Sequence, residues 1–281
     1  MRWRTGRRSS NVEDRRGTSI GGKGKVTGGI GVVILALVGM YFGVDPALIM
    51  NSGLLQGDGS QVQKVEKRSD AENQLADFTS VVLADTEDTW SQIFQQAGKS
   101  YQPPKLVLFT NQIRSACGFA KSATGPFYCP ADRKVYVDLG FYQELRNNLN
   151  APGDFAQAYV IAHEVGHHVQ NLLGISPKVQ AQRGKISKKQ YNALSVKLEL
   201  QADCFAGIWA NHADRVNNIV EPGDVNEALN AASRIGDDTL QKQARGYAVP
   251  DSFTHGTSSQ RVAWFTKGYK SGNINDCNTF R

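Results

Sequence analysis

The strongest constraint on this chain is a pair of histidines, His163 and His167, that encloses a glutamate in the pattern H-E-x-x-H. The pattern lies in a stretch of helical periodicity that begins at Asp154, the predicted N-cap, and ends near Gly174. Residues four apart project from the same face of a helix, so both imidazoles can bind one metal ion. Glu164 follows the first histidine, where its carboxylate can reach a metal-bound water. Two surface histidines on an amphipathic helix are the alternative, which a third ligand would exclude.

A second pattern, E-x-x-A-D, offers that third ligand. Glu199 and Asp203 stand four residues apart on the next predicted helix, residues 187–211, and therefore share a face. One carboxylate can complete a zinc site of two histidines and one glutamate that leaves the fourth position to water. The other can accept the free ring N–H of a ligand histidine. A solvated acidic pair is the alternative, but the apolar neighbours Leu198 and Phe205 favour a buried metal site.

The rest of the chain predicts a helical domain with a small sheet. Further helices are predicted at residues 71–98, from Asp224 and after Thr257 or Ser258, and strands at residues 105–110 and 135–139. Asp224 and Glu227 have the spacing of a capping box. Because helix dominates but strands are present, the expected class is α+β, with one domain over residues 75–281.

Positive charge is concentrated at the N-terminus. The chain of 281 residues has a net charge of +6, and residues 1–25 hold eight Lys or Arg against two acids, which accounts for all of the excess. The remainder is neutral and offers no basic excess to attract phosphates. We therefore expect no nucleic-acid partner.

An uncharged stretch, residues 26–44, follows this basic tail. Its 19 residues are close to the ~20 that a helix needs to cross a bilayer. The positive-inside rule then predicts a cytoplasmic N-terminus and a domain outside the cytoplasmic membrane, periplasmic or extracellular. A cleaved signal peptide and a buried core helix are the alternatives, and the lack of an A-x-A cleavage pattern disfavours the first.

These features divide the chain before its domain into three segments. Residues 1–25 are expected to be a cytoplasmic tail and residues 26–44 a single-pass anchor. Residues 45–74, rich in Gly, Ser, Asn and Gln, are expected to be a flexible linker. Within the anchor, Gly39 and Gly43 form a G-x-x-x-G pair that would allow a weak homodimer of membrane helices.

The strings around both motifs, HEVGHHVQ and ELQADCFAG, resemble a bacterial family of membrane-anchored neutral zinc metallopeptidases of gluzincin type. SACG, GPFYCP, VYVDLGF and HGTSSQRVAWF are similar to the same family, so the resemblance covers nearly the whole chain. It implies a zincin-like domain and a peptide or protein substrate. It also implies one Zn²⁺ per chain, bound by His163, His167 and Glu199, with Glu164 as general base. A metzincin would carry a third histidine where this chain has Leu173.

Two residues further along the chain could complete such a site. The segment around His255, with Arg261 after it, is similar to the T-H-P…R segment of the prenyl-protease and heat-shock-protease gluzincins, with Gly256 in place of proline. Gluzincins often stabilise the oxyanion with a downstream histidine, and His255 is predicted in this role. Arg261 could support it or pair with Asp203, and a purely structural salt bridge is the alternative. His168 could bond to the domain or flank the cleft.

All four cysteines lie in the part of the chain expected to be exported, where disulfides form. Four cysteines allow three pairings. We favour Cys117–Cys129, which would staple a hairpin, and Cys204–Cys277, which would tie the C-terminus to the helix of Glu199. A second zinc site is the alternative, but the spacing is unlike that of structural zinc ligands.

Together these features predict a membrane-anchored, zinc-dependent endopeptidase in which Glu164 accepts the proton of a metal-activated water. One alternative is a catalytically weak or inactive zinc-binding scaffold or sensor at the membrane. The presence of Glu164 disfavours it, because a structural site needs no base. A zinc amidase that acts on cell-wall peptide is the other alternative, and residue types do not separate it from a protease.

Overall fold

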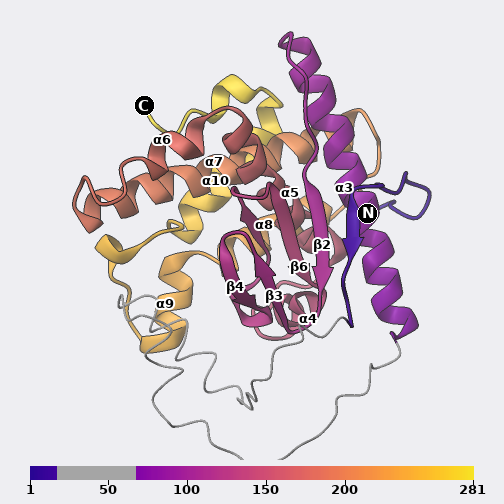
Figure 1. Ribbon diagram of the computed structural model, residues 1–281, viewed down its shortest axis with the longest axis horizontal. Helices are drawn as coiled ribbons and strands as arrows, with labels where there is room; N and C mark the ends of the chain where they lie inside the picture. Colours follow the sequence, from indigo (N-terminus) through magenta and orange to yellow (C-terminus); the bar gives the residue numbers. More distant parts are fainter. Residues whose placement is uncertain (18–67) are drawn as a thin grey trace, which may run out of the picture.

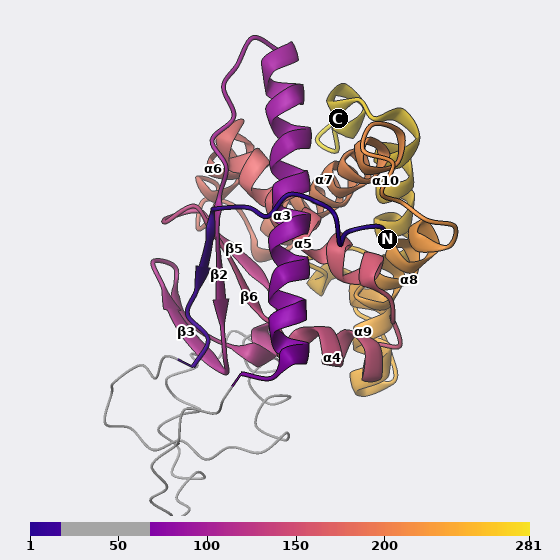
Figure 2. The same ribbon diagram turned by 90° about the vertical axis from the view of Figure 1, so that its right-hand side faces the viewer.

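A small sheet with helices on one face supports the histidine-bearing helix. The structure, a computed structural model, describes residues 1–17 and 68–281. Helix α3 (Asp70–Gln96) and helix α5 (Asp154–Leu172), which carries the H-E-x-x-H pattern, lie against one face of the sheet (Figures 1 and 2). The predicted α+β class is confirmed.

The sheet has four strands in the order β1-β2-β6-β5. These are β1 (Val12–Asp14), β2 (Lys105–Phe109), β6 (Lys134–Asp138) and β5 (Phe127–Cys129). The first three strands are parallel, with Val107 opposite Tyr136, and β5 is antiparallel to β6, with Tyr128 opposite Val135. The short strand β5 therefore forms the edge of the sheet beside α5.

Both faces of the sheet are buried, which explains why β2 is almost wholly apolar. Leu106 and Leu108 point into the main core with α3 and α5, whereas Val107 and Phe109 belong to a smaller cluster on the opposite face. That second face is covered by Ile113 of the hairpin formed by β3 (Gln112–Ser115) and β4 (Gly118–Lys121). Of the described strands, the sequence predicted β2 and β6 and gave β3, β4 and β5 only as a hairpin near Cys117 and Cys129, whereas β1 was missed.

The second helical layer lies beyond α5. It contains α7 (Lys188–Arg215), α8 (Asp224–Arg234) and α10 (Ser258–Ser271), and the remaining short helices are α4 (Gly140–Asn147), α6 (Ile175–Gln180) and α9 (Asp237–Arg245). Helices α5 and α7 approach closely at Gly166, where an added Cβ would stand 3.0 Å from the carbonyl oxygen of Ala202. Because no side chain separates the two backbones there, the H-E-x-x-H and E-x-x-A-D patterns face each other.

Both predicted disulfides are confirmed. Cys117–Cys129 joins the turn of the β3–β4 hairpin to β5, with the Cα atoms 5.8 Å apart. Cys204–Cys277 joins α7 to the C-terminal segment, with the Cα atoms 5.6 Å apart. One bond thus fixes the edge strand, and the other fixes the helix that carries Glu199.

Residues 1–17, which we call the N-terminal strap, do not form the separate tail predicted for residues 1–25. Their strand β1 extends the sheet (Figure 2). Trp3 packs edge-on against Phe78 of α3. The α-ammonium group of Met1 lies 2.9 Å from the carboxylate of Asp154 at the start of α5. Charges that suggested a tail are paired with acids of α3, as in the ion pair between Arg8 and Asp77.

The boundaries and caps of several helices also differ from the predictions. Helix α3 begins at Asp70, so the domain extends into the predicted linker. The N-cap of α5 is Gly153, and Asp154 is the first helical residue. The capping box at Asp224 is absent because Glu227 instead accepts the backbone N–H of Phe155. The predicted Thr257 cap of α10 is present.

The predicted membrane anchor, residues 26–44 with Gly39 and Gly43, lies outside the described residues, as does most of the linker at 45–74. Among residues 1–17 and 68–281, no helix has both the length and the apolar character that a membrane span requires.

Candidate metal centre

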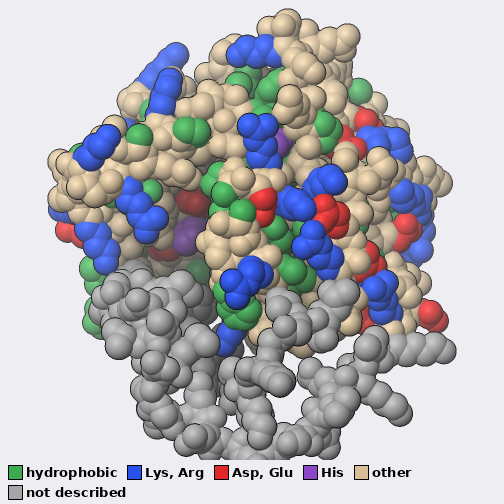
Figure 3. Space-filling view, viewed as in Figure 1, with side chains coloured by type: hydrophobic (Ala, Val, Ile, Leu, Met, Phe, Trp, Pro, Cys, Tyr) green, Lys and Arg blue, Asp and Glu red, His purple; other side chains and the backbone are tan. Residues whose placement is uncertain are grey.

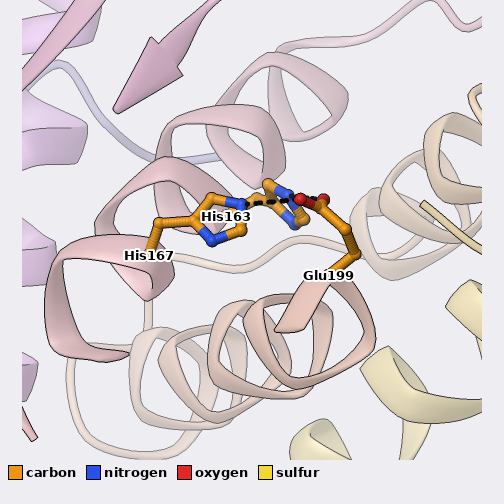
Figure 4. A group of neighbouring side chains, drawn as sticks. All are labelled: His163, His167 and Glu199. Carbon is orange, nitrogen blue, oxygen red and sulfur yellow. Dashed lines mark hydrogen bonds and ion pairs between the residues drawn. The ribbon is translucent and has the colours of Figure 1, made fainter. Parts of the chain in front are cut away.

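The three predicted ligands converge between α5 and α7 (Figure 4). His163 Nε2 lies 3.2 Å from one carboxylate oxygen of Glu199, and His167 Nε2 lies 3.4 Å from the other. One donor atom from each residue falls within a group no wider than 4.8 Å. Two imidazole nitrogens and one carboxylate with room for a fourth ligand are the donor set of catalytic zinc sites. The residues present therefore fit Zn²⁺.

The hydrogen bonds made by the two Nδ1 atoms leave both Nε2 atoms facing Glu199, the third predicted ligand. His163 Nδ1 lies 2.9 Å from Oδ1 of Asp203, and His167 Nδ1 lies 2.9 Å from the amide oxygen of Gln170. Because carboxylate and amide oxygens only accept, each Nδ1 carries the proton and donates. Gln170 is held in turn by a bond from its amide nitrogen to the carbonyl of Leu198.

A buried ionic cluster supports His163 from behind. Arg261 donates to both oxygens of Asp203, at 2.8 Å and 2.9 Å, and Tyr159 donates its hydroxyl to Oδ1 at 2.6 Å. Burial opposes the charge of Asp203, but Arg261 and His163 outweigh it and lower the pKa of this carboxyl to about 2. Arg261 thus pairs with Asp203, which is one of the roles predicted for it.

The electrostatics of the site keep the ligand residues paired when no metal is bound. Burial opposes protonation of His163, but the charge and hydrogen bond of Asp203, with the hydrogen bond of Glu199, raise its pKa to about 10. The same histidines lower the pKa of Glu199 against the effect of burial. Metal binding must displace this proton, so metal uptake is expected to depend on pH.

Glu164 lies beside the ligands in a buried position on α5. Burial raises the pKa of its carboxyl, while the two ligand histidines act in the opposite direction. The backbone N–H of Tyr128 on β5 also acts to lower the pKa of this carboxyl. A carboxyl whose pKa is raised by burial suits proton transfer near neutral pH.

His255 lies outside the three converging ligands, on the loop before α10, with its side chain 51% exposed. Asp237 builds this loop. Its Oδ2 accepts the backbone N–H groups of Thr254, His255 and Gly256, and its Oδ1 lies 3.1 Å from Nδ1 of His255. Burial opposes protonation, but this bond and the charge of Glu199 raise the pKa of His255. Among the described residues, Asp237 bonds to Nδ1 of His255, whereas Nε2 has no hydrogen-bond partner.

The site opens to the surface. In the face shown in Figure 3, a histidine and acidic side chains form the floor of a hollow beside the β3–β4 hairpin. Sequence patterns missed Asp237, Gln170 and Tyr128. An acid directly after a glycine at a helix start is the only local signal for Asp237. Gln170 and Tyr128 lie within HEVGHHVQ and GPFYCP, two of the strings that resemble the family, but no spacing rule marks them.

Comparison with known proteins agrees with the geometry. A family model described as "Putative neutral zinc metallopeptidase" matches residues 1–280. The uncharacterized protein YpfJ of Escherichia coli K12 is 53% identical over 289 residues, which cover 100% of this chain and 99% of that protein. The uncharacterized protein Rv2575 of Mycobacterium tuberculosis H37Rv is 37% identical over 256 residues, which cover 86% and 84%. No solved structure is significantly similar, so the zincin-like fold stays a prediction.

Proposed function

Because the chain belongs to the family described as putative neutral zinc metallopeptidases, we propose that it is a zinc-dependent endopeptidase of gluzincin type. His163, His167 and Glu199 would hold the ion. The observation that carries the proposal is the convergence of two Nε2 atoms on one carboxylate, with both Nδ1 protons already donated elsewhere. That arrangement presents a zinc donor set without rearrangement of the rings.

Each residue has a definite part in peptide hydrolysis. Zinc bound there would act as a Lewis acid and activate a water near neutral pH. Glu164 would accept the proton of that water and pass it to the leaving amine. His255, oriented by Asp237, would donate from Nε2 to the oxyanion. Arg261 would have an indirect part. It holds the carboxylate of Asp203, and that carboxylate holds the ring of His163.

The sheet edge gives the proposal a peptide-binding element. Strand β5 lies next to α5, and among the described residues its outer edge has no strand partner. An extended peptide can add to such an edge through backbone hydrogen bonds. The substrate would then run along β5, with its scissile bond over the converging ligands.

The test uses the full chain with four variants. We expect about one zinc per chain in the wild type, much less in His163→Ala and Glu199→Ala, and normal zinc but no turnover in Glu164→Gln. Asp237→Asn should keep zinc and lose turnover. The measurements are elemental analysis and cleavage of an unfolded protein with and without a chelator. Normal zinc in Glu199→Ala would remove that residue from the ligand set. Full zinc without any cleavage would favour the scaffold or amidase alternatives.

A further inference from the structure

His168 follows the second ligand but belongs to a different contact network. One residue along a helix turns the side chain by about 100°, so His168 points away from the converging ligands. Its side chain is almost fully buried, with 1% exposed, and packs edge-on against Tyr101 and Tyr128. Nothing in the proposed hydrolysis uses it.

The hydrogen bonds of His168 have only one consistent direction. Its Nε2 lies 2.7 Å from the carbonyl oxygen of Gln102, which can only accept, so Nε2 carries the proton. Nδ1 then accepts a hydrogen bond from the hydroxyl group of Tyr128, with Nδ1 and the hydroxyl oxygen 3.0 Å apart. The Tyr128 oxygen in turn accepts from the amide nitrogen of Asn171 at 3.0 Å. His168 and Asn171, both on α5, thus form hydrogen bonds with one side chain of the edge strand, Tyr128.

The same tyrosine reaches the active site through its backbone. Tyr128 is the middle residue of β5, and its backbone N–H favours the charged form of the Glu164 carboxyl and so acts to lower its pKa. A strand of three residues, paired only with β6 in the described part of the chain, has few contacts to fix its distance from α5. The Cys129 disulfide holds it to the hairpin, whereas the tyrosine hydroxyl holds it to α5.

We propose that His168 is a positioning residue that holds Tyr128, and with it the strand β5, beside the general base Glu164. The proposal rests on the proposed peptidase function. It assigns α5 two tasks on two faces: one face supplies the metal ligands, and the other clamps the strand that lies next to the base. The clamp also sets the separation between β5 and α5, along which a bound peptide would lie.

The experiment compares His168→Phe and Tyr128→Phe with Tyr142→Phe in the full chain. Tyr142 is the matched control because its hydroxyl is likewise hydrogen-bonded to a side chain, Thr79 at 3.0 Å, but lies in the α3–α4 part of the core. We expect kcat to fall about 10- to 100-fold in the two clamp variants, as for a misplaced catalytic group. KM, zinc content and the kcat of the control should change little.

Two further measurements separate positioning from general damage. The double variant should lose less than the two single losses combined, because both substitutions break the same contact between His168 and Tyr128. His168→Gln, which retains a donor and an acceptor, should recover part of kcat. Amide exchange in β5 should rise in His168→Phe whether or not a substrate is known, which tests the clamp even if the wild type does not cleave peptides.

Unchanged kcat together with unchanged β5 exchange in His168→Phe would overturn the proposal. Loss of zinc in that variant would also overturn it, since His168 would then act through the neighbouring ligand His167. A wild type without turnover but with faster β5 exchange in His168→Phe would refute the peptidase function and leave the clamp standing.

Discussion

The carboxylate of Asp203 accepts hydrogen bonds from Tyr159, His163 and Arg261, and is fully buried. Removing its charge would leave the Arg261 guanidinium, itself only 3% exposed, without a counter-ion. It would also release the ring of His163 from its fixed tautomer. A buried residue that binds no metal thus controls both the stability of the core and the geometry of the ligands.

Asp203→Asn should therefore lower zinc affinity about 10- to 100-fold, the usual effect of losing a partner behind a ligand histidine. The free energy of unfolding should fall by about 3–5 kcal/mol, because a buried ion pair is broken on one side. Competition with a chelating dye and urea unfolding measure the two effects. The control is Asp251→Asn, which breaks the exposed pair with Lys189. Unchanged zinc affinity in Asp203→Asn would show that His163 needs no anchor.

At this scale the sequence was informative where spacing along one helix decides the geometry. The i, i+4 spacing predicted that His163 and His167 share one helix face, and that Glu199 and Asp203 share another. It was uninformative where a residue gains its role from a contact between distant segments. Tyr128 on the edge strand is such a case, since a single tyrosine in a loop-rich stretch forms no pattern.

Among the elements, β1 is the one that sequence patterns could not have predicted. It has three residues, VED, inside a run of charged residues, and it is a strand only because β2 pairs with it. Long helices such as α3 and α7 carry their own apolar periodicity, and their ends were predicted to within a few residues. Short strands depend on partners that are distant in sequence, and three of them lie in the hairpin region around Cys117.

The attachment of β1 should weaken at acid pH. Glu13 of β1 accepts a hydrogen bond from Lys134 of β6 at 2.8 Å. Lys134, together with Arg15, lowers the pKa of Glu13 from 4.5 to about 2, although burial acts in the opposite direction. A lowered pKa stabilises the fold fully above pH ~4.5, and this contribution of at most about 3 kcal/mol disappears as the pH falls towards 2. Glu13→Gln should thus be less stable than wild type at pH 7 in urea unfolding. The difference should close only below pH ~2, and a gap that is constant with pH would contradict this origin.

The Cys204–Cys277 bond should matter more than Cys117–Cys129. The two bonds close loops of 73 and 12 residues, for which chain-entropy models give about 4 and about 3 kcal/mol. The longer loop also ends on α7, next to Asp203. Cys277→Ser should therefore lower both Tm and zinc affinity, whereas Cys129→Ser should lower Tm less and leave zinc affinity unchanged. Equal zinc affinity in both variants would separate the C-terminus from the metal centre.

For the whole molecule, the strap has a topological consequence. Its contacts and those of residues 68–281 form one packed body, so both parts must lie in the same compartment when the protein is folded. A single membrane crossing by residues 26–44 would place them in opposite compartments. The predicted cytoplasmic N-terminus with an exported domain would therefore require residues 1–17 to detach from β2 and α3. The side of the membrane on which the domain lies stays a prediction.

Impermeant maleimide labelling of intact cells tests this topology. The native cysteines are all in disulfides, so cysteines introduced at the exposed positions Ser10 and Ala263 would be the only reactive thiols. We expect both positions to be labelled or both to be protected. Labelling of only one would show that the strap leaves the domain in the cell.

The residues on either side of positions 18–67 form hydrogen bonds with each other. Arg68 donates to the backbone carbonyl of Arg16 at 2.8 Å and to the carboxylate of Asp14 at 2.9 Å, and Arg16 donates to the carbonyl of Glu72. Residues 1–17 and 68–281 therefore form one continuous body, the host, across this junction. Inserts whose ends meet at the surface can be exchanged without rebuilding the host. A few glycines and serines from Gly17 to Arg68 should suffice to close the host, whereas a chain cut back to residue 68 would lose β1 and leave the edge of β2 open to aggregation.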